Sequence, residues 1–190
     1  MKATYFAPIF LAAALGAAGF VALADFEPGG SIRIEGSSNV EGWRCTAPRY
    51  TGTFAGTGRG DALTSIERLT FTVPVNGIQC KNGTMNGKLR HALKAPANPS
   101  IVYTMQSNRV GAATAGKFAV EAAGQLALAG QTHHVQMTVQ GQSLGGGRYR
   151  FTGSTPISMR SYGMERVTAL LGTMRVRDGV TVHFDVVVTR

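Results

Sequence analysis

The chain has 190 residues, a formal net charge of +9 and a sequence pI near 10.2, so it is long enough for one domain with a substantial core. Its ten acidic residues are mostly scattered singly, which argues against a catalytic pair of carboxylates. The positive charge suits anionic lipid head groups, acidic glycans or nucleic acid, and it equally suits plain solubility, so charge alone selects no partner.

The first 24 residues have the pattern of a secretory signal peptide. Lys2 supplies a positive start, an apolar run rich in Ala and Gly follows, and Ala22-Leu23-Ala24 gives a small-x-small cleavage site before Asp25. The alternative is a retained membrane anchor, but the run is a little short and only weakly apolar for a spanning helix. We expect cleavage, export to the periplasm or medium, and a mature domain of residues 25–190 with charge +8.

Alternation of apolar and polar residues predicts strands in the first half of that domain. The segments 31–40 and 69–75 read this way, and Pro74 places the end of the second one at a sheet edge or bulge. Residues 41–46, between them, carry the only Trp and then Cys45. The period then changes over residues 84–95, where Met85, Leu89 and Leu93 share one helical face. We expect a short helix here, capped by Asn86 and stopped by Pro96.

The second half returns to strand periodicity. Strands are predicted over 100–105, 117–120 and 148–159, with a hairpin over 124–141 that turns at Gly130-Gln131. Residues 172–190 predict a closing hairpin that turns at Asp178-Gly179. The count is about eight strands, at which an antiparallel barrel can close around side chains or one small ligand.

The chain has two cysteines, Cys45 and Cys80. In an exported protein an even count predicts one disulfide, here between residues 35 positions apart, with a stabilisation of about 3–4 kcal/mol. A CxxC redox pair is absent, and two thiolates alone make an incomplete zinc site.

The sequence offers no catalytic, metal or cofactor site. Adjacent strand residues point to opposite faces, so His133 and His134 cannot chelate one ion without a bulge. No GxSxG elbow activates a serine, and a bridged cysteine is no nucleophile. We therefore expect no enzyme activity, no cofactor and no metal.

One set of residues is in phase on the apolar faces of the predicted strands. The aromatic members alternate with aliphatic ones, as expected for an inward face and not for a base-stacking platform, so we expect no nucleic-acid partner. Periodicity alone does not distinguish a hollow barrel from one filled by side chains. The predicted lining comprises Leu69, Phe71, Val73, Ile101, Tyr103, Met105, Leu126, Leu128, Val135, Met137, Val139, Phe151, Val182, Phe184 and Val186.

Several segments, in order, resemble the YceI-like family of exported lipid- and polyisoprenoid-binding proteins. They are GSSNVEGWRC, NGTMNGKLRHALKAPANPSIVYTM, GQLALAGQTHHVQMTV and ISMRSYGM followed by LLGTMRVRDGVTVHFDV, which together cover most of residues 31–188. The resemblance implies an extended lipocalin-like antiparallel barrel that holds a long isoprenoid or fatty chain in an apolar tunnel, without catalysis.

The leading hypothesis is a non-enzymatic barrel that sequesters or carries a long apolar ligand, such as a polyisoprenoid, an isoprenoid quinone or a fatty-acid-like lipid. Basic residues on the helix of residues 88–94 suit a phosphate head group or an anionic membrane surface. The alternative is a ligand-free structural or stress-response interaction barrel with a solid core. The sequence does not fix the oligomeric state, and a dimer is compatible with it.

Overall fold

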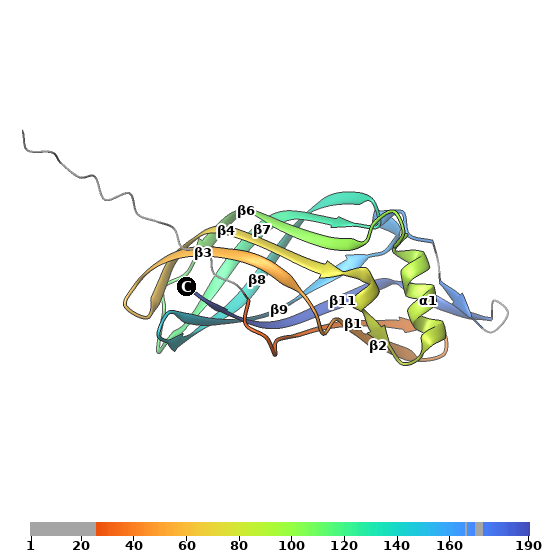
Figure 1. Ribbon diagram of the computed structural model, residues 1–190, viewed down its shortest axis with the longest axis horizontal. Helices are drawn as coiled ribbons and strands as arrows, with labels where there is room; N and C mark the ends of the chain where they lie inside the picture. Colours follow the sequence, from red (N-terminus) through yellow and green to blue (C-terminus); the bar gives the residue numbers. More distant parts are fainter. Residues whose placement is uncertain (1–25, 166, 170–172) are drawn as a thin grey trace, which may run out of the picture.

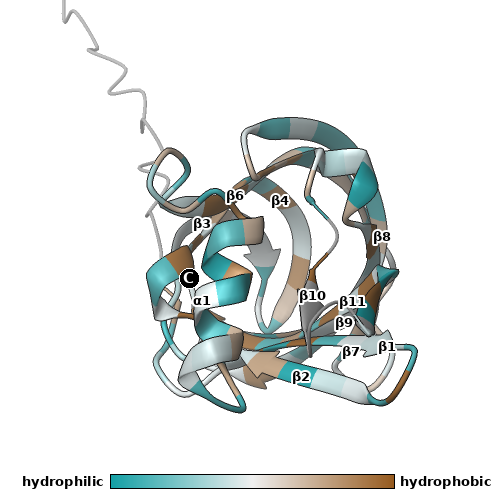
Figure 2. Ribbon diagram, turned by 90° about the vertical axis from the view of Figure 1, so that its right-hand side faces the viewer, coloured by the Kyte–Doolittle hydropathy of each residue, from teal (hydrophilic) through white to brown (hydrophobic). Residues whose placement is uncertain are grey.

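The computed structural model of the protein describes residues 26–165, 167–169 and 173–190. The predicted signal peptide, residues 1–24, lies outside the described residues. A single antiparallel sheet curls around an elongated interior, and one short helix lies across part of one end (Figures 1 and 2). The predicted fold class, an all-β lipocalin-like barrel with one short helix, is confirmed.

The described residues form eleven strands, of which eight have at least eight residues and three are short. The number of long strands equals the predicted number, although not every predicted strand coincides with an observed one. In sheet order the strands are β3 (Thr51–Arg59), β4 (Ala62–Pro74), β6 (Ser100–Val110), β7 (Lys117–Leu128), β8 (Gln131–Gly145), β9 (Arg148–Ser158), β11 (Met174–Thr189), β1 (Ser31–Ser38), β2 (Gly42–Thr46) and β5 (Gln79–Cys80), while β10 (Thr168–Ala169) pairs only with β11.

The sheet is curled without being closed by backbone pairing in the part of the chain that the structure describes. Its path begins at β3 and ends at β5, and no ladder joins these two edges there. The barrel is therefore a curled sheet that no ladder closes among the described residues.

The predicted hairpin over residues 124–141 is present as β7 and β8. Its two-residue turn is Ala129-Gly130, with φ of 52° and 84°, one position earlier than predicted. Two positive φ angles in succession are the signature of the type I′ turn, whose twist matches that of the flanking strands.

The predicted closing hairpin at Asp178-Gly179 is wrong. β11 runs through both residues and pairs with β9 on one side and β1 on the other. The ladder with β1 is irregular here. Gly36 pairs with Val180 and Ser38 pairs with Val176, so two more residues lie between the paired positions on β11 than on β1. The Asp-Gly pair thus forms a bulge and not a chain reversal.

Asp178 stabilises this bulge through its carboxylate. Oδ2 accepts a hydrogen bond from the Ser158 hydroxyl and Oδ1 accepts one from the Arg160 backbone N–H, both at 2.7 Å. Arg160 begins the 3₁₀ turn η2 (Arg160–Tyr162), which follows β9. The aspartate therefore fixes the exit of the chain from β9, a role that local turn statistics do not reveal.

The predicted helix is confirmed as α1 (Gly83–Ala92), but its cap is Asn82 and not Asn86. The Asn82 side chain accepts a hydrogen bond from the Met85 N–H at 2.9 Å. Asn86 lies one turn inside the helix, where its Oδ1 accepts from the backbone N–H of Cys80 at 2.6 Å. Asn86 thereby ties α1 to β5.

β3 and the first half of β4 were not predicted from the sequence. This stretch contains Gly52, Gly56 and Gly58, which interrupt the apolar alternation on which strand prediction depends. The GTGRGD run forms the end of β3 and its turn into β4, in a hairpin that the residues Gly60 and Asp61 connect.

Buried apolar side chains form two clusters, one toward each end of the molecule. The first cluster includes Ile32, Cys45 and Leu93 and packs near α1. The second includes Phe54 and Tyr149 and packs beneath the β3–β4 hairpin. Partly buried residues such as Phe71 contact both clusters, so the interior is continuous from end to end.

Candidate ligand-binding cavity

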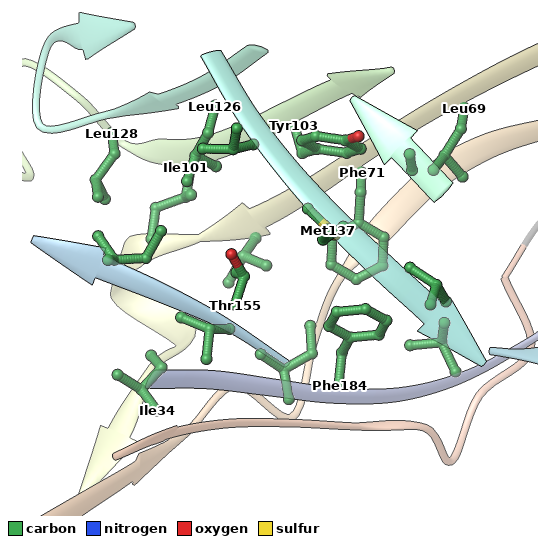
Figure 3. Close-up of a pocket in the computed structure, with 18 of the residues that line it drawn as sticks. Ile34, Leu69, Phe71, Ile101, Tyr103, Leu126, Leu128, Met137, Thr155 and Phe184 are labelled. Carbon is green, nitrogen blue, oxygen red and sulfur yellow. The ribbon is translucent and has the colours of Figure 1, made fainter. Parts of the chain in front are cut away.

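A cavity of about 230 Å³ lies inside the curled sheet and is lined almost entirely by carbon and sulfur atoms (Figure 3). Leu89 of α1 and Leu93, which caps the end of α1, contribute to its wall. Phe54 of β3 and Ile66 of β4 also contribute, so the wall draws on both core clusters. For comparison, an engineered cavity of about 150 Å³ lined by aliphatic side chains stays dry and binds benzene.

The cavity is long in the direction of the strands. Val120 and Leu128, eight residues apart on β7, both line it. At about 3.4 Å per residue this separation is about 27 Å along the strand. The shape suits an extended chain better than a compact ring system.

All fifteen residues of the predicted lining lie in the wall of this cavity. Period-two alternation explains the agreement, because every second side chain of a strand faces the concave side of the sheet. Val182, Phe184 and Val186 of β11 face inward even though the predicted hairpin around them is wrong. Their contact with a ligand remains a prediction.

Fifteen further residues of the wall were not predicted from the sequence. Some had a usable signal: Ile32 and Ile34 alternate on β1, Ile157 and Met159 alternate at the end of β9, and the apolar face of α1 carries Leu89 and Leu93. The other wall residues could be identified only from the tertiary structure. The additional wall residues are Phe26, Ile32, Ile34, Trp43, Phe54, Ile66, Leu89, Leu93, Val120, Ala122, Thr155, Ile157, Met159, Met164 and Val180.

Few polar groups reach this wall. Among its described residues, only Trp43, Tyr103 and Thr155 carry a side-chain N–H or O–H group, and none carries a charge. Burial raises the pKa of Tyr103 above its ordinary value, so its phenol stays protonated. The cavity can therefore solvate an apolar chain but offers no charged partner to an ionic head group.

Charged residues pair on the outside of the sheet. Arg150 of β9 and Asp185 of β11 are diagonal neighbours, with Arg150 Nε 2.7 Å from Asp185 Oδ1, and this hydrogen bond lowers the pKa of the Asp185 carboxyl. Glu35 lies between Arg33, Arg44 and His183, and its pKa is also lowered: the hydrogen bond from Arg44 and the nearby positive charges outweigh the opposing effect of desolvation.

Another outer ion pair fixes the start of the described chain. Arg148 binds both oxygens of the Glu27 carboxylate, at 2.8 and 2.7 Å, and Thr189 donates a further hydrogen bond to it. These hydrogen bonds lower the pKa of Glu27 to about 2. The adjacent Phe26 lines the cavity and packs edge-on against Phe71, so the ion pair also positions part of the wall.

The predicted disulfide is present. Cys45 of β2 and Cys80 of β5 are directly paired in the ladder and are bonded to each other. Such a bond fits an oxidising compartment.

The histidines do not assemble a metal site within the described residues, where no group of three His, Cys, Asp or Glu side chains lies close enough to hold an ion. His133 and His134 are both exposed, and the His133 ring packs edge-on against Tyr162. No helix in the described residues is long and apolar enough to cross a membrane.

Comparison with known proteins identifies one family. The model of the YceI-like domain matches residues 32–188. A search of curated protein sequences found no match.

Solved structures share the fold at low sequence identity. A polyisoprenoid-binding domain from Saccharophagus degradans implicated in plant cell wall breakdown aligns with a TM-score of 0.68 and 14% identity, over 89% of this chain and 98% of that one. BcnA from Burkholderia cenocepacia aligns with a TM-score of 0.63 and 16% identity, over 83% and 95%. The YCEI protein of Campylobacter jejuni aligns with 0.60 and 15%, over 75% and 82%.

Proposed function

This chain belongs to the YceI-like domain family, and from that premise we propose that its cavity binds the apolar chain of a lipid, for sequestration or transport and without catalysis. One observation carries the proposal: an uncharged, apolar cavity extends through the interior between the two core clusters. The polyisoprenoid-binding domain of S. degradans, which shares the fold, supports a polyisoprenoid or related lipid as the ligand class.

Burial of the ligand supplies the binding energy. Each CH₂ group that leaves water contributes about 0.8 kcal/mol, so a long chain needs no specific polar contact to be held. Met105, Met137 and Met159 lie in the wall, and their thioether side chains adapt their shape to a flexible chain. A ligand-free structural barrel would have its interior filled by side chains, and the cavity argues against that alternative.

Two features of the chain support export. Residues 1–24 have the pattern of a cleaved signal peptide, and the Cys45–Cys80 disulfide needs an oxidising compartment to persist. We therefore assign the mature domain, residues 25–190, to the periplasm or the extracellular medium.

The α1 end of the cavity is the proposed side of approach to a membrane. Leu89 of α1 and its C-cap residue Leu93 line the cavity. Lys88 and Arg90 belong to the same helix, Lys94 follows it, and the helix contains no acidic residue. A basic helix across one end of a lipid cavity favours an anionic bilayer surface or a phosphate head group.

The test combines native mass spectrometry with organic extraction of the purified protein, followed by addition of a polyprenol. The wild type should carry or take up one lipid. Met137→Trp, which adds bulk inside the cavity, should lower the occupancy at least about tenfold, since a blocked cavity buries less of the chain.

Thr138→Trp is the matched control, because Thr138 is the next residue on β8 and is exposed on the outer face. It should bind like the wild type. If no lipid copurifies and added polyprenol does not enter the wild type, the proposed function is wrong. Equal occupancy in the two tryptophan variants would place the ligand outside this cavity.

A further inference from the structure

The cavity is too small for a long ligand as the structure stands. Its volume is about 230 Å³, which is about 1.5 times the volume of a cavity that binds one benzene molecule. In proportion, it holds about nine carbon atoms, far fewer than a polyprenol contains. A long chain therefore fits only if part of the wall moves outward.

The two free edges of the curled sheet are held in different ways. At the β5 edge, the Cys45–Cys80 disulfide joins β5 to β2, and Asn86 of α1 accepts a hydrogen bond from the Cys80 N–H. At the other edge, β3 pairs only with β4 in the ladders described. A covalent bond thus restrains the first edge, whereas no disulfide restrains the second.

The hairpin of β3 and β4 extends beyond the rest of the sheet as a two-stranded flap, residues 54–69. β4 pairs with β6 over residues 70–74, while β3 and β4 stay paired with each other out to Arg59 and Ala62. Figure 1 shows this hairpin at the end of the molecule opposite α1. Among the described residues, no ladder joins the flap to a strand outside the hairpin.

The flap begins where aromatic side chains fix the hairpin to the sheet. Phe71 of β4 pairs with Tyr103 of β6, and the rings of Phe26 and Tyr50 pack on Phe71 at centroid distances of 5.0 and 5.1 Å. Beyond this point the register between β3 and β4 shifts twice, within residues 55–58, which interrupts the regular ladder. The geometry places a hinge between the anchored Phe71 and the flap.

Apolar side chains hold the flap against the interior. Phe54, Leu63 and Ile66 are 0%, 3% and 8% exposed and belong to the second core cluster, and Phe54 and Ile66 also line the cavity. Asn108 of β6 adds a polar tie, since its Nδ2 donates a hydrogen bond to the Ile66 carbonyl oxygen at 2.7 Å. Because apolar contacts are not directional, the CH₂ groups of a ligand can replace those that the flap loses when it lifts.

We propose that the β3–β4 flap swings outward about its junction with β6 when a long chain occupies the cavity, and so enlarges the cavity beneath Phe54 and Ile66. This inference rests on the proposed function. It assigns the adaptation to chain length to the β3 edge of the sheet, while the disulfide-linked α1 end keeps its shape.

The experiment compares octane, which the cavity holds with the flap closed, with hexadecane, which needs the flap open. Each protein is equilibrated with both alkanes, and the bound alkanes are extracted and measured by gas chromatography. Asn108→Ala removes a tie of the closed flap and is not a wall residue. It should raise the ratio of bound hexadecane to bound octane about fivefold, the shift in population expected for the loss of one hydrogen bond. Octane occupancy should equal that of the wild type, which also shows that the variant folds.

Asn39→Ala is the matched control. The Asn39 Nδ2 also donates a hydrogen bond to a backbone carbonyl oxygen, that of Thr173 at 2.9 Å, but Asn39 lies in the turn between β1 and β2, near α1 (Figure 1). This variant should leave the ratio unchanged. A rise in Asn39→Ala without a rise in Asn108→Ala would place the moving wall at the α1 end and overturn the proposal.

A distance measurement tests the motion with the Asn108 tie intact. Nitroxide labels are attached to Asp61→Cys, at the tip of the flap, and to Gln140→Cys on β8, because both positions are exposed and both native cysteines are bonded. Pulsed electron paramagnetic resonance should give a longer distance with hexadecane bound than with octane bound.

The remaining outcomes separate this inference from the function on which it rests. An unchanged ratio in Asn108→Ala, or an unchanged label distance with hexadecane bound, overturns the flap and leaves apolar binding standing. Uptake of octane without hexadecane by the wild type would show that the wall does not move. If neither alkane enters any of the proteins, the proposed function and this inference fall together.

Discussion

Aromatic side chains of the interior lie over glycine residues of neighbouring strands. At each such position a Cβ on the glycine would come closer than 3.0 Å to ring atoms. Glycine there leaves the space that the ring occupies, which a Cβ would fill. The pairs are Trp43 over Gly36, Phe26 over Gly52, Tyr103 over Gly124, Phe118 over Gly141 and Phe184 over Gly153.

Gly141→Ala should destabilise the protein by about 1–3 kcal/mol, the usual cost of overpacking a core. Its Cβ would lie 2.3 Å from Phe118 Cε2. The Phe118 ring cannot easily move, because it packs edge-on against Tyr149 and Phe151. Urea unfolding followed by tryptophan fluorescence measures the change.

Gly87→Ala is the control for that experiment. Gly87 lies within α1, and nothing lies within 4 Å of the position its Cβ would take. Alanine has the higher helix propensity, so this variant should be unchanged or more stable by up to about 1 kcal/mol. Equal destabilisation of the two variants would show that the space around Gly141 is not tightly filled.

At the level of the elements, the weakest part of the sheet is its β5 edge. β5 has two residues, pairs only with β2 in the ladders described, and is tied to its surroundings by the Cys45–Cys80 disulfide and by the Asn86 side chain of α1. The disulfide therefore holds both the last strand and the helix whose Leu89 and Leu93 line one end of the cavity.

The double variant Cys45→Ala/Cys80→Ala should lose about 3–4 kcal/mol of stability, because the unfolded chain is no longer closed into a loop of 35 residues. Urea unfolding should give the same midpoint for this variant with and without a reducing agent. The wild type should shift to a lower midpoint only when reduced. If the double variant had the same midpoint as the oxidised wild type, a stabilising role for the disulfide would be contradicted.

Across the whole molecule, one carboxylate, that of Glu27, joins segments that lie far apart in the described chain. Glu27 lies near its start, Arg148 begins β9, and Thr189 ends β11. The hydrogen bonds from Arg148 and Thr189 lower the pKa of Glu27 from 4.5 to about 2. A carboxyl with a depressed pKa stabilises the folded state above its unfolded pKa and ceases to do so as pH falls through its folded value.

The contribution of Glu27 to stability should therefore be complete above pH 4.5 and disappear as pH falls toward 2. Glu27→Gln should lower the thermal midpoint at pH 7, and the difference from the wild type should shrink between pH 4.5 and 2.5. Thermal melts followed by circular dichroism over this range measure it.

Glu121→Gln controls for the loss of one negative charge, because Glu121 is exposed on β7. A difference between the wild type and Glu27→Gln that stayed constant from pH 7 to pH 2.5 would show that the ion pair does not set the acid response.

The local sequence predicted half of the residues of the cavity wall, but it predicted the strands of the sheet less completely. Strand alternation identified fifteen wall residues, because the two-residue period of a strand decides which side chains face inward whatever the strand pairs with. The glycine-rich β3 and the start of β4 were missed, since their strand character comes from pairing with each other and from the rings that lie over them.

The sequence by itself therefore determined the barrel class, the helix, the disulfide pair and half of the cavity wall, all of which follow from local periodicity or from cysteine count. Only the tertiary structure decided the path of β11, where pairing with β1 and β9 on its two sides overrides the turn preference of Asp178-Gly179. It alone shows that the Tyr103 hydroxyl is unpaired, because a hydrogen-bond partner depends on neighbours brought together by folding and not on local sequence.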